Sequence, residues 1–184
     1  MRRDKNRLVK ILIALAKFGY FALGILVIFA LAYLLGYKFL GYKFIEGYLL
    51  GNDSSNALTF IYWLDRYFPK IPAWYPLQGG GVSFTQGYPL LAHFLVVLLH
   101  RISNFTLIQA FRFLGFLSIP LTALGIYLFC WTRLKSQTIG FIGAIFYLLT
   151  PLSWSWLYDW GFFGYSLSFS PFIFSFICIE KKMA

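Results

Sequence analysis

Residues 8–36 read LVKILIALAKFGYFALGILVIFALAYLLG, a nearly continuous apolar run. A helix needs about 20 apolar residues to cross the hydrocarbon core of a bilayer, so this run predicts a membrane-spanning helix. Its only charged residues, Lys10 and Lys17, lie near its start, where long side chains can reach the membrane interface. The run follows a basic segment that predicts a cytoplasmic anchor, formed by Arg2, Arg3, Lys5 and Arg7.

The same run has a second interpretation as a secretory signal peptide. Ala30-Leu31-Ala32 has the small-residue pattern of a cleavage site. However, the apolar run is long for the core of a signal peptide, and it continues past Ala32. We therefore favour an uncleaved signal-anchor helix.

The composition of the whole chain agrees with this interpretation. Of the 184 residues, 60% are hydrophobic and only 12% are charged, whereas soluble domains are about half apolar and a quarter charged. These values exclude a disordered chain, a water-soluble globule and a disulfide-stapled secreted module. The net charge of +10 is typical of the cytoplasmic flanks of a membrane protein, and the 22 Phe and 13 Tyr residues argue against a nucleic-acid partner.

Three further apolar segments are predicted to cross the membrane. Residues 105–131 are long enough, residues 138–152 are marginal, and residues 160–179 contain Pro171, which membrane helices tolerate. The predicted fold class is an all-α integral membrane protein with about four transmembrane helices. Its organisation is a basic start with the first transmembrane helix at 1–36, an outer loop at 37–104, and three further transmembrane helices at 105–184.

The outer loop is predicted to contain two helices that lie in the membrane interface. In residues 54–68, one helical face is apolar, at Ala57, Ile61, Leu64 and Phe68. Residues 89–101 are apolar but number about 13, too few to cross. If 89–101 did cross, the basic turn at 133–135 would move outside, so we favour the flat arrangement.

The distribution of basic residues predicts the orientation. With 89–101 flat, the N-terminus, the 133–135 turn and the 180–182 tail all face the cytoplasm, which favours a multi-pass protein of the cell membrane. Basic residues then obey the positive-inside rule. Ten lie inside and six outside: inside are Arg2, Arg3, Lys5, Arg7, Lys10, Lys17, Arg133, Lys135, Lys181 and Lys182, and outside are Lys38, Lys43, Arg66, Lys70, Arg101 and Arg112.

Carboxylates are scarce, and this limits the candidates for a site. Of the six acidic residues, Glu46, Asp53, Asp65 and Asp159 face outward in this orientation. Asp53 and Asp159 belong to different outer loops, so each loop could deliver one carboxylate to the same membrane surface. Such carboxylates can accept a proton from a hydroxyl group or hold a divalent metal. Asp53 also precedes a predicted helix, where it would be a good N-cap.

Several short motifs follow one another in an order that resembles a known superfamily. They are Gly51-Asn52-Asp53, then FPKIPAWYP at 68–76, GGG at 79–81 and GYPLL at 87–91. Together they resemble the N-terminal part of the GT-C superfamily of polytopic glycosyltransferases. The most similar variant is the membrane domain family named 6-pyruvoyl-tetrahydropterin-synthase-related, with YfhO-like proteins. The resemblance covers nearly the whole chain as a loose pattern. Members usually have many more spans, so it implies that this chain is part of a longer protein.

The resemblance implies transfer of a sugar, with inversion, from a lipid-phosphate-linked donor on the outer membrane face. In that family the first acidic residue of the outer loop acts as general base or metal ligand, and Asp53 occupies the matching place. Asp159 matches a second, assisting acidic residue less closely. A divalent ion such as Mg²⁺ or Mn²⁺ at Asp53 would offset the charge of the donor phosphate.

Basic residues of the outer segments are the candidates for binding the donor. Lys70, Arg101 and Arg112 could offset the phosphate charge without a metal. His93 is a candidate for contact with a lipid head group. The expected partners are therefore membrane lipids and a lipid-phosphate-linked sugar.

Two other classes of protein compete with a glycosyltransferase. A transporter should carry polar or charged residues at the bilayer midplane, and the predicted spans have almost none. A non-enzymatic scaffold or assembly subunit agrees with the composition. It should tolerate loss of Asp53, whereas an enzyme should not.

Overall fold

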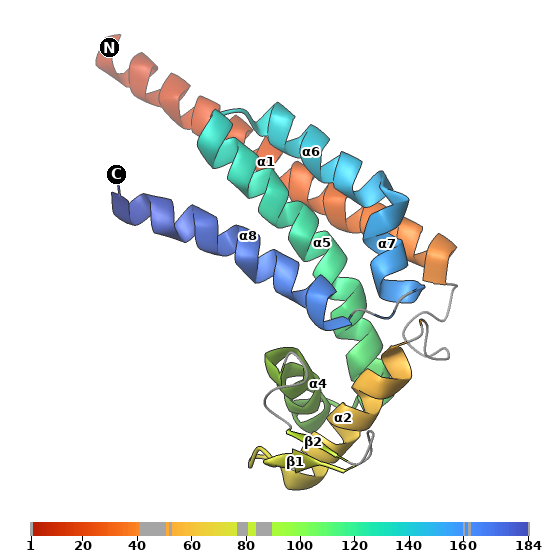
Figure 1. Ribbon diagram of the computed structural model, residues 1–184. Coiled ribbons are helices and arrows are strands. Elements are labelled where there is room, and N and C mark those ends of the chain that lie inside the picture. The colour runs from red at the N-terminus through yellow and green to blue at the C-terminus, as the bar shows by residue number, and fades with distance from the viewer. Residues whose placement is uncertain are drawn as a thin grey trace.

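The computed structural model of the chain describes residues 2–40, 51, 53–76, 81–83, 90–159, 161 and 163–183. The described elements are α1 (Arg2–Leu40), α2 (Ser54–Tyr67), β1 (Trp74–Tyr75), β2 (Val82–Ser83), α4 (Leu90–Ile102), α5 (Leu107–Leu134), α6 (Gln137–Leu149), α7 (Pro151–Tyr158) and α8 (Phe163–Met183). Figure 1 shows α1, α5, α6 and α8 running along one another as a bundle. A smaller unit of α2, β1, β2 and α4, which we call the cap, surrounds the start of α5.

Two helices are long and apolar enough to cross a membrane, at Phe18–Tyr37 of α1 and along the whole of α5. Helices α6 and α7 make a third span if the pair, bent by 47°, counts as one. This confirms a mainly helical chain with helices able to span a membrane. The predicted fourth span coincides with α8, whose apolar part is the shorter segment Phe163–Cys178. Its length of about 24 Å is less than the ~30 Å of a typical hydrocarbon core.

The contact between α1 and the bundle is made by every fourth residue on one helical face, and three of these four residues are small. Gly24, Ile28, Ala32 and Gly36 are all buried on one face of α1. A Cβ atom at Gly24 would lie 3.3 Å from the Tyr127 hydroxyl oxygen, and one at Gly36 would lie 2.6 Å from the Phe116 ring. Small side chains allow membrane helices to approach closely, and packing contacts then hold them together.

The predicted span at 138–152 is interrupted, because Pro151 starts a separate helix, α7. Proline cannot donate a backbone hydrogen bond, so carbonyl groups at the end of α6 lose their helical partners. Side chains replace these donors at two carbonyls, with Ser153 Oγ donating to Tyr147 O at 2.8 Å and Trp154 Nε1 to Leu148 O at 2.8 Å. Phe146 O keeps the Thr150 N–H at 3.0 Å and also accepts from Thr150 Oγ1 at 2.7 Å. A broken helix at membrane depth is stable only when its freed backbone groups are satisfied in this way.

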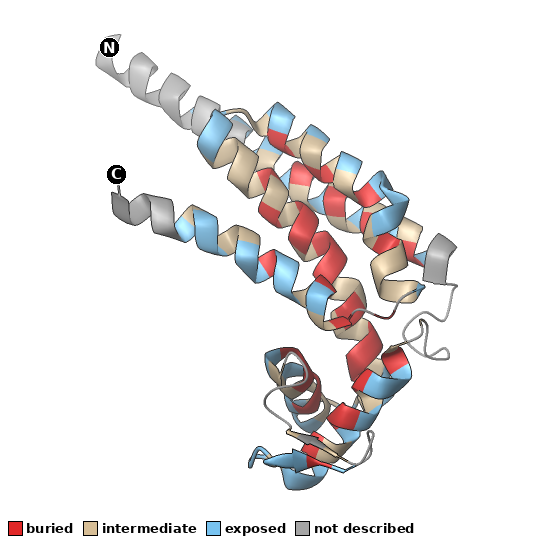
Figure 2. Cartoon of the chain, viewed as in Figure 1, coloured by how far each residue is buried: buried red, intermediate tan, exposed pale blue. Residues whose placement is uncertain are grey.

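The apolar stripe predicted on α2 is present, but protein covers it. Ala57, Ile61 and Leu64 are buried in a cluster with Val96 of α4 and Phe111 of α5. Figure 2 shows buried residues lining the inner faces of α2 and α4 and the adjoining part of α5. The expectation that this stripe faces the membrane interface is therefore wrong.

Helix α4 has 13 residues, and its length fits the expectation that this segment does not cross a membrane. One face is buried in the cap core. The opposite face exposes four large apolar residues at helical spacing, namely Leu91, Leu95, Leu98 and Ile102. The start of the predicted helix, at Pro89, lies outside the described residues.

The short β-hairpin is a feature that the all-α prediction missed. Trp74 pairs with Ser83 and Tyr75 with Val82 in antiparallel register. Tyr75 is buried, its ring centroid lies 3.9 Å from that of Phe60, and its hydroxyl donates to Thr59 Oγ1 at 2.6 Å. Strands of two residues are too short to show an alternating pattern in a sequence, which is why the hairpin was not predicted. Its contacts with α2 hold it in place.

Candidate functional site

Three segments meet where the cap joins the bundle, and we call this place the junction. The first is the start of α2, at Asp53 and Ser54. The second is the stretch of α5 from Phe111 to Gly115. The third is the connection between α7 and α8, described at 157–159, 161 and 163.

Close contacts define the junction. Gly161 has a φ of +72°, and a Cβ atom there would lie 2.7 Å from Ser54 N and 3.1 Å from Asp53 N. The ring centroids of Phe111 and Phe163 are 4.4 Å apart. A Cβ atom at Gly115 would lie 3.0 Å from Leu157 Cδ1. The backbone of the α7–α8 connection therefore touches the start of α2, while α5 packs beside both.

Asp53 occupies the N-cap position of α2, but its side chain makes no capping hydrogen bond. The physical reason is its helical backbone conformation, with φ −92° and ψ −3°. A capping side chain normally requires an extended backbone to reach the free N–H groups of the first turn. The Asp53 carbonyl instead accepts from Ala57 N at 2.9 Å. Asp53 is half-buried, and its carboxylate does not cap the helix.

Asp159 reaches the junction from the bundle. It ends α7, its N–H donates to Ser155 O at 2.9 Å, and its side chain is exposed. Two residues span at most about 7 Å, so Asp159 lies close to Gly161 and hence to the start of α2. The structure thus brings together the segments that carry Asp53 and Asp159, although 106 positions separate these residues in the sequence.

Arg112 lies on the α5 side of the junction and is 9% exposed. It follows Phe111, which contacts Phe163, and precedes Gly115, which contacts Leu157. A guanidinium group has five N–H donors and keeps its charge. In such a buried place its attraction for an anion exceeds that of an exposed cation.

Two predicted donor-binding residues lie elsewhere. Arg101 Nε donates to Asp65 Oδ1 at 2.8 Å, and Arg101 Nη2 donates to Asp65 O at 3.0 Å. Asp65 is near the far end of α2, about 18 Å along the helix from Asp53. Lys70 is exposed just beyond that end, with its N–H donating to Tyr67 O at 2.8 Å. Neither Lys70 nor Arg101 joins the junction, because the length of α2 separates them from it.

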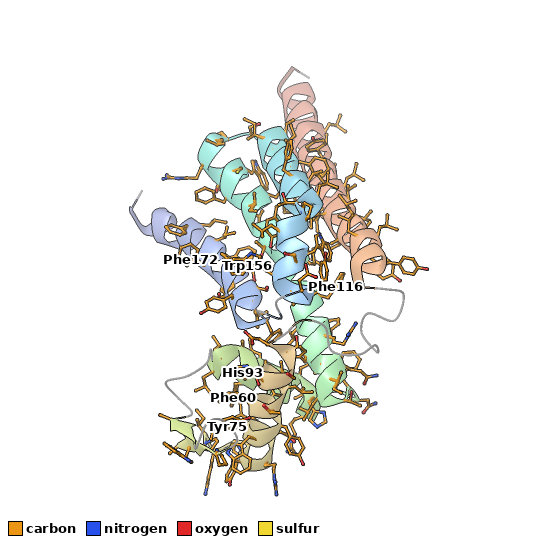
Figure 3. All side chains as sticks on the ribbon, turned by 45° about the vertical axis from the view of Figure 1, so that its right-hand side comes forward. Phe60, Tyr75, His93, Phe116, Trp156 and Phe172 are labelled. Atoms are coloured by element: carbon orange, nitrogen blue, oxygen red, sulfur yellow. The ribbon has the colours of Figure 1, made fainter. Side chains whose placement is uncertain are left out.

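His93 is buried in the cap core rather than presented to a lipid head group. It is 1% exposed and lies between the rings of Phe60 and Phe163, at centroid distances of 6.1 and 6.4 Å. Figure 3 shows His93, Phe60 and Tyr75 following one another within the cap. Burial lowers the pKa of His93 to about 4, so its ring is neutral at physiological pH.

The described residues contain no preformed metal site. Within the described part of the chain, no three His, Cys, Asp or Glu residues gather as a metal-binding group. The junction offers the carboxylates of Asp53 and Asp159. Mg²⁺ commonly binds through one or two carboxylates together with water and substrate phosphates.

Sequence reasoning missed Gly161, the residue that permits the contact with α2. Glycine adopts positive φ without strain, and its lack of a Cβ atom allows the close approach to Ser54. Its position two residues after Asp159 was the available signal. Comparison with known protein families, curated proteins and solved structures finds no match for this chain.

Proposed function

We propose that the chain is a module of a GT-C-like membrane glycosyltransferase. It transfers a sugar from a lipid-phosphate-linked donor to an acceptor on the outer face of the cell membrane. The observation that carries this proposal is the junction. Segments bearing Asp53, Asp159 and Arg112 meet there at one end of an apolar helical bundle.

The proposed chemistry is a single displacement at the sugar's anomeric carbon. An acceptor hydroxyl attacks from the side opposite the phosphate, the new C–O bond forms, and the bond to the lipid phosphate breaks. Asp53 takes the hydroxyl proton as general base, and Asp159 assists it. Arg112 stabilises the negative charge that develops on the leaving phosphate. A divalent ion held by Asp53 would supply the same stabilisation.

The proposed topology has α1, α5, the α6–α7 pair and α8 as four spans. The N-terminus is cytoplasmic and the cap lies outside. Two observations support this arrangement. The basic residues are distributed ten to six in favour of the inside. Both ends of the described chain also lie at the end of the bundle away from the cap (Figure 1). The exposed apolar face of α4, from Leu91 to Ile102, then contacts the outer membrane interface.

The test compares two aspartates of the same helix. The full chain in membrane vesicles is given radiolabelled polyprenyl-phosphate sugars and a cell-envelope extract as acceptor. We expect wild type and Asp65→Asn to consume a donor, and Asp53→Asn to lose this activity while still folding. Asn keeps the size of Asp53, and no capping hydrogen bond is lost. Equal activity of Asp53→Asn and wild type would contradict the proposal, and consumption of no donor by wild type would favour a membrane scaffold.

The same assay separates the two ways of stabilising the leaving phosphate. If Asp53 holds a metal, a chelator should abolish transfer, and Mg²⁺ or Mn²⁺ should restore it. If Arg112 alone stabilises the phosphate, transfer should resist the chelator and be lost in Arg112→Gln.

A further inference from the structure

A pocket with a volume of about 430 Å³ lies between α5, the α6–α7 pair and α8. It opens on the outside of the bundle, because two of its lining residues, Leu152 and Phe169, are 59% and 45% exposed. In Figure 3, Trp156 of its wall lies beside α8. Two of its walls, α5 and the α6–α7 pair, are candidate membrane spans. A molecule dissolved in a surrounding bilayer can therefore enter the pocket directly.

The wall of the pocket restricts the charge of its ligand. None of the lining residues in the described part of the chain is charged. Half of them are large apolar residues, namely Ile126, Leu152, Trp156, Phe169 and Ile173. Burying an ion among such side chains without an opposite charge is strongly unfavourable. A volume of this size and a mainly apolar wall with a few polar groups are typical of sites for small ligands. The pocket therefore suits a neutral and largely apolar molecule.

Three hydroxyl groups lie close together in this wall, and we call them the hydroxyl cluster. They belong to Thr122 of α5, Tyr147 of α6 and Ser153 of α7. The Tyr147 hydroxyl lies within hydrogen-bonding reach of the Thr122 and Ser153 side chains. Thr122 Oγ1 donates its own hydrogen to Ser118 O at 2.8 Å, and Ser153 Oγ donates to Tyr147 O at 2.8 Å. Two of the three hydrogen atoms are thus used by backbone carbonyls, and the third is shared within the cluster.

The hydroxyl cluster therefore has more lone pairs than hydrogen atoms to offer a ligand. The O–H group of an alcohol can donate to such a cluster, whereas an ether, an ester or a ketone can only accept. A neutral ligand that donates here also satisfies its own polar group inside the apolar wall, which avoids the cost of burying an unpaired hydroxyl.

We propose that this pocket binds a neutral lipid alcohol. Its hydroxyl group donates to the hydroxyl cluster, and its hydrocarbon part packs against Ile126, Trp156 and Ile173. The site goes beyond the proposed sugar transfer and is independent of it. Neither aspartate of the junction lines the pocket, nor does Arg112, and the bound alcohol undergoes no reaction.

The test is photo-crosslinking of the full chain in phospholipid nanodiscs with two matched probes. One probe is a hexadecanol that carries a diazirine and an alkyne in its chain, and the other is its methyl ether. Labelled peptides are mapped by mass spectrometry. We expect the alcohol to label the peptides of the pocket about tenfold more than the ether does, a ratio that corresponds to about 1.4 kcal/mol. Both probes should label exposed α6 residues such as Phe146 equally.

Variants separate the hydroxyl cluster from the apolar wall. Tyr147→Phe should reduce labelling by the alcohol to the level of the ether and leave the ether unchanged. The matched control is Tyr33→Phe, at an exposed α1 position outside the pocket, which should keep the preference for the alcohol. Thr122→Val covers the case in which Tyr147→Phe does not fold, and should have the same effect. Ile173→Trp fills the pocket and should reduce labelling by both probes.

Several results would overturn the proposal. They are equal labelling of the pocket by alcohol and ether in wild type, and a preference for the alcohol that survives both Tyr147→Phe and Thr122→Val. Competition with an unlabelled isoprenoid alcohol and with an unlabelled diacylglycerol then identifies the source of the hydroxyl group as the stronger competitor. Displacement of the probe by neither of them would also overturn the proposal.

Discussion

The two ends of α2 each carry an aspartate, and their surroundings differ. Asp65 forms an ion pair with Arg101 at 2.8 Å and also accepts from it through the backbone carbonyl. Asp53 makes no capping hydrogen bond and lies against the connection that carries Asp159. One end of the helix thus uses its carboxylate to attach α4. The other end places Asp53 at the junction. The two aspartates are the same residue type, so their positions distinguish the one that forms an ion pair from the one that is a candidate for catalysis.

The largest effect is expected at the junction end of α2, in Gly161→Ala. The substitution forces a positive φ on alanine and places its Cβ atom 2.7 Å from Ser54 N, so the backbone must shift. We expect a loss of about 4 kcal/mol in the free energy of unfolding. Denaturant unfolding in detergent measures it. The control is Gly19→Ala, where nothing lies within 4 Å and little change is expected. A Gly161→Ala protein as stable as the control would show that the contact with α2 is not formed.

The cap core between the two ends should make the protein sensitive to acid. The pKa of His93 is lowered from 6.5 to about 4 by burial, so the folded state resists protonation more than the unfolded state does. The stability contributed by the neutral ring is complete above pH 6.5 and is lost as the pH falls toward 4. We expect a decrease of up to about 3 kcal/mol over that interval.

Melting temperatures at pH 7 and pH 4.5 measure this decrease. His93→Leu should weaken the dependence on pH, whereas His100→Gln should keep it. An unchanged pH dependence in His93→Leu would mean that other groups cause the acid sensitivity.

The smallest effect is expected at the far end of α2. The ion pair of Asp65 and Arg101 is partly exposed, with side-chain exposures of 17% and 48%. Such pairs contribute at most about 1 kcal/mol, and salt screens them. A double-mutant cycle of Asp65→Asn and Arg101→Gln should therefore give a coupling energy of about 0.5 kcal/mol that decreases in high salt. A coupling energy as large as the effect of Gly161→Ala would remove the contrast between the two ends.

The sequence predicted the helices well where long apolar runs determine them. Residues 105–131 correspond to α5, and the limits of α2 differ from prediction by one residue. Periodicity identified the apolar face of α2 but not its partner, because a stripe has the same spacing whether lipid or protein covers it. The bend before α7 is stabilised by hydrogen bonds that the side chains of Thr150, Ser153 and Trp154 donate to backbone carbonyls. These hydrogen bonds leave no recognisable pattern in the sequence.

The candidate site was predictable only in part. The scarcity of carboxylates points to Asp53 and Asp159, and the structure brings their segments together. Arg101 and Lys70 share the outer loop with Asp53 in the sequence, but α2 places them at its far end, away from Asp53. Spacing along the sequence does not show which residues of a long loop lie close together in the folded chain. It also gives no value for φ, which is why Gly161 was missed.

The most direct test of the account asks whether Asp53 and Asp159 share one membrane face, opposite the α5–α6 turn. Cys130 and Cys178 are first replaced by Ala, and single cysteines are then introduced at positions 53, 159, 70 and 135. Intact cells are treated with a membrane-impermeant maleimide. The proposed topology predicts labelling at 53, 159 and 70 in intact cells, and at 135 only after permeabilisation. Labelling of 53 and 159 from opposite sides would contradict it.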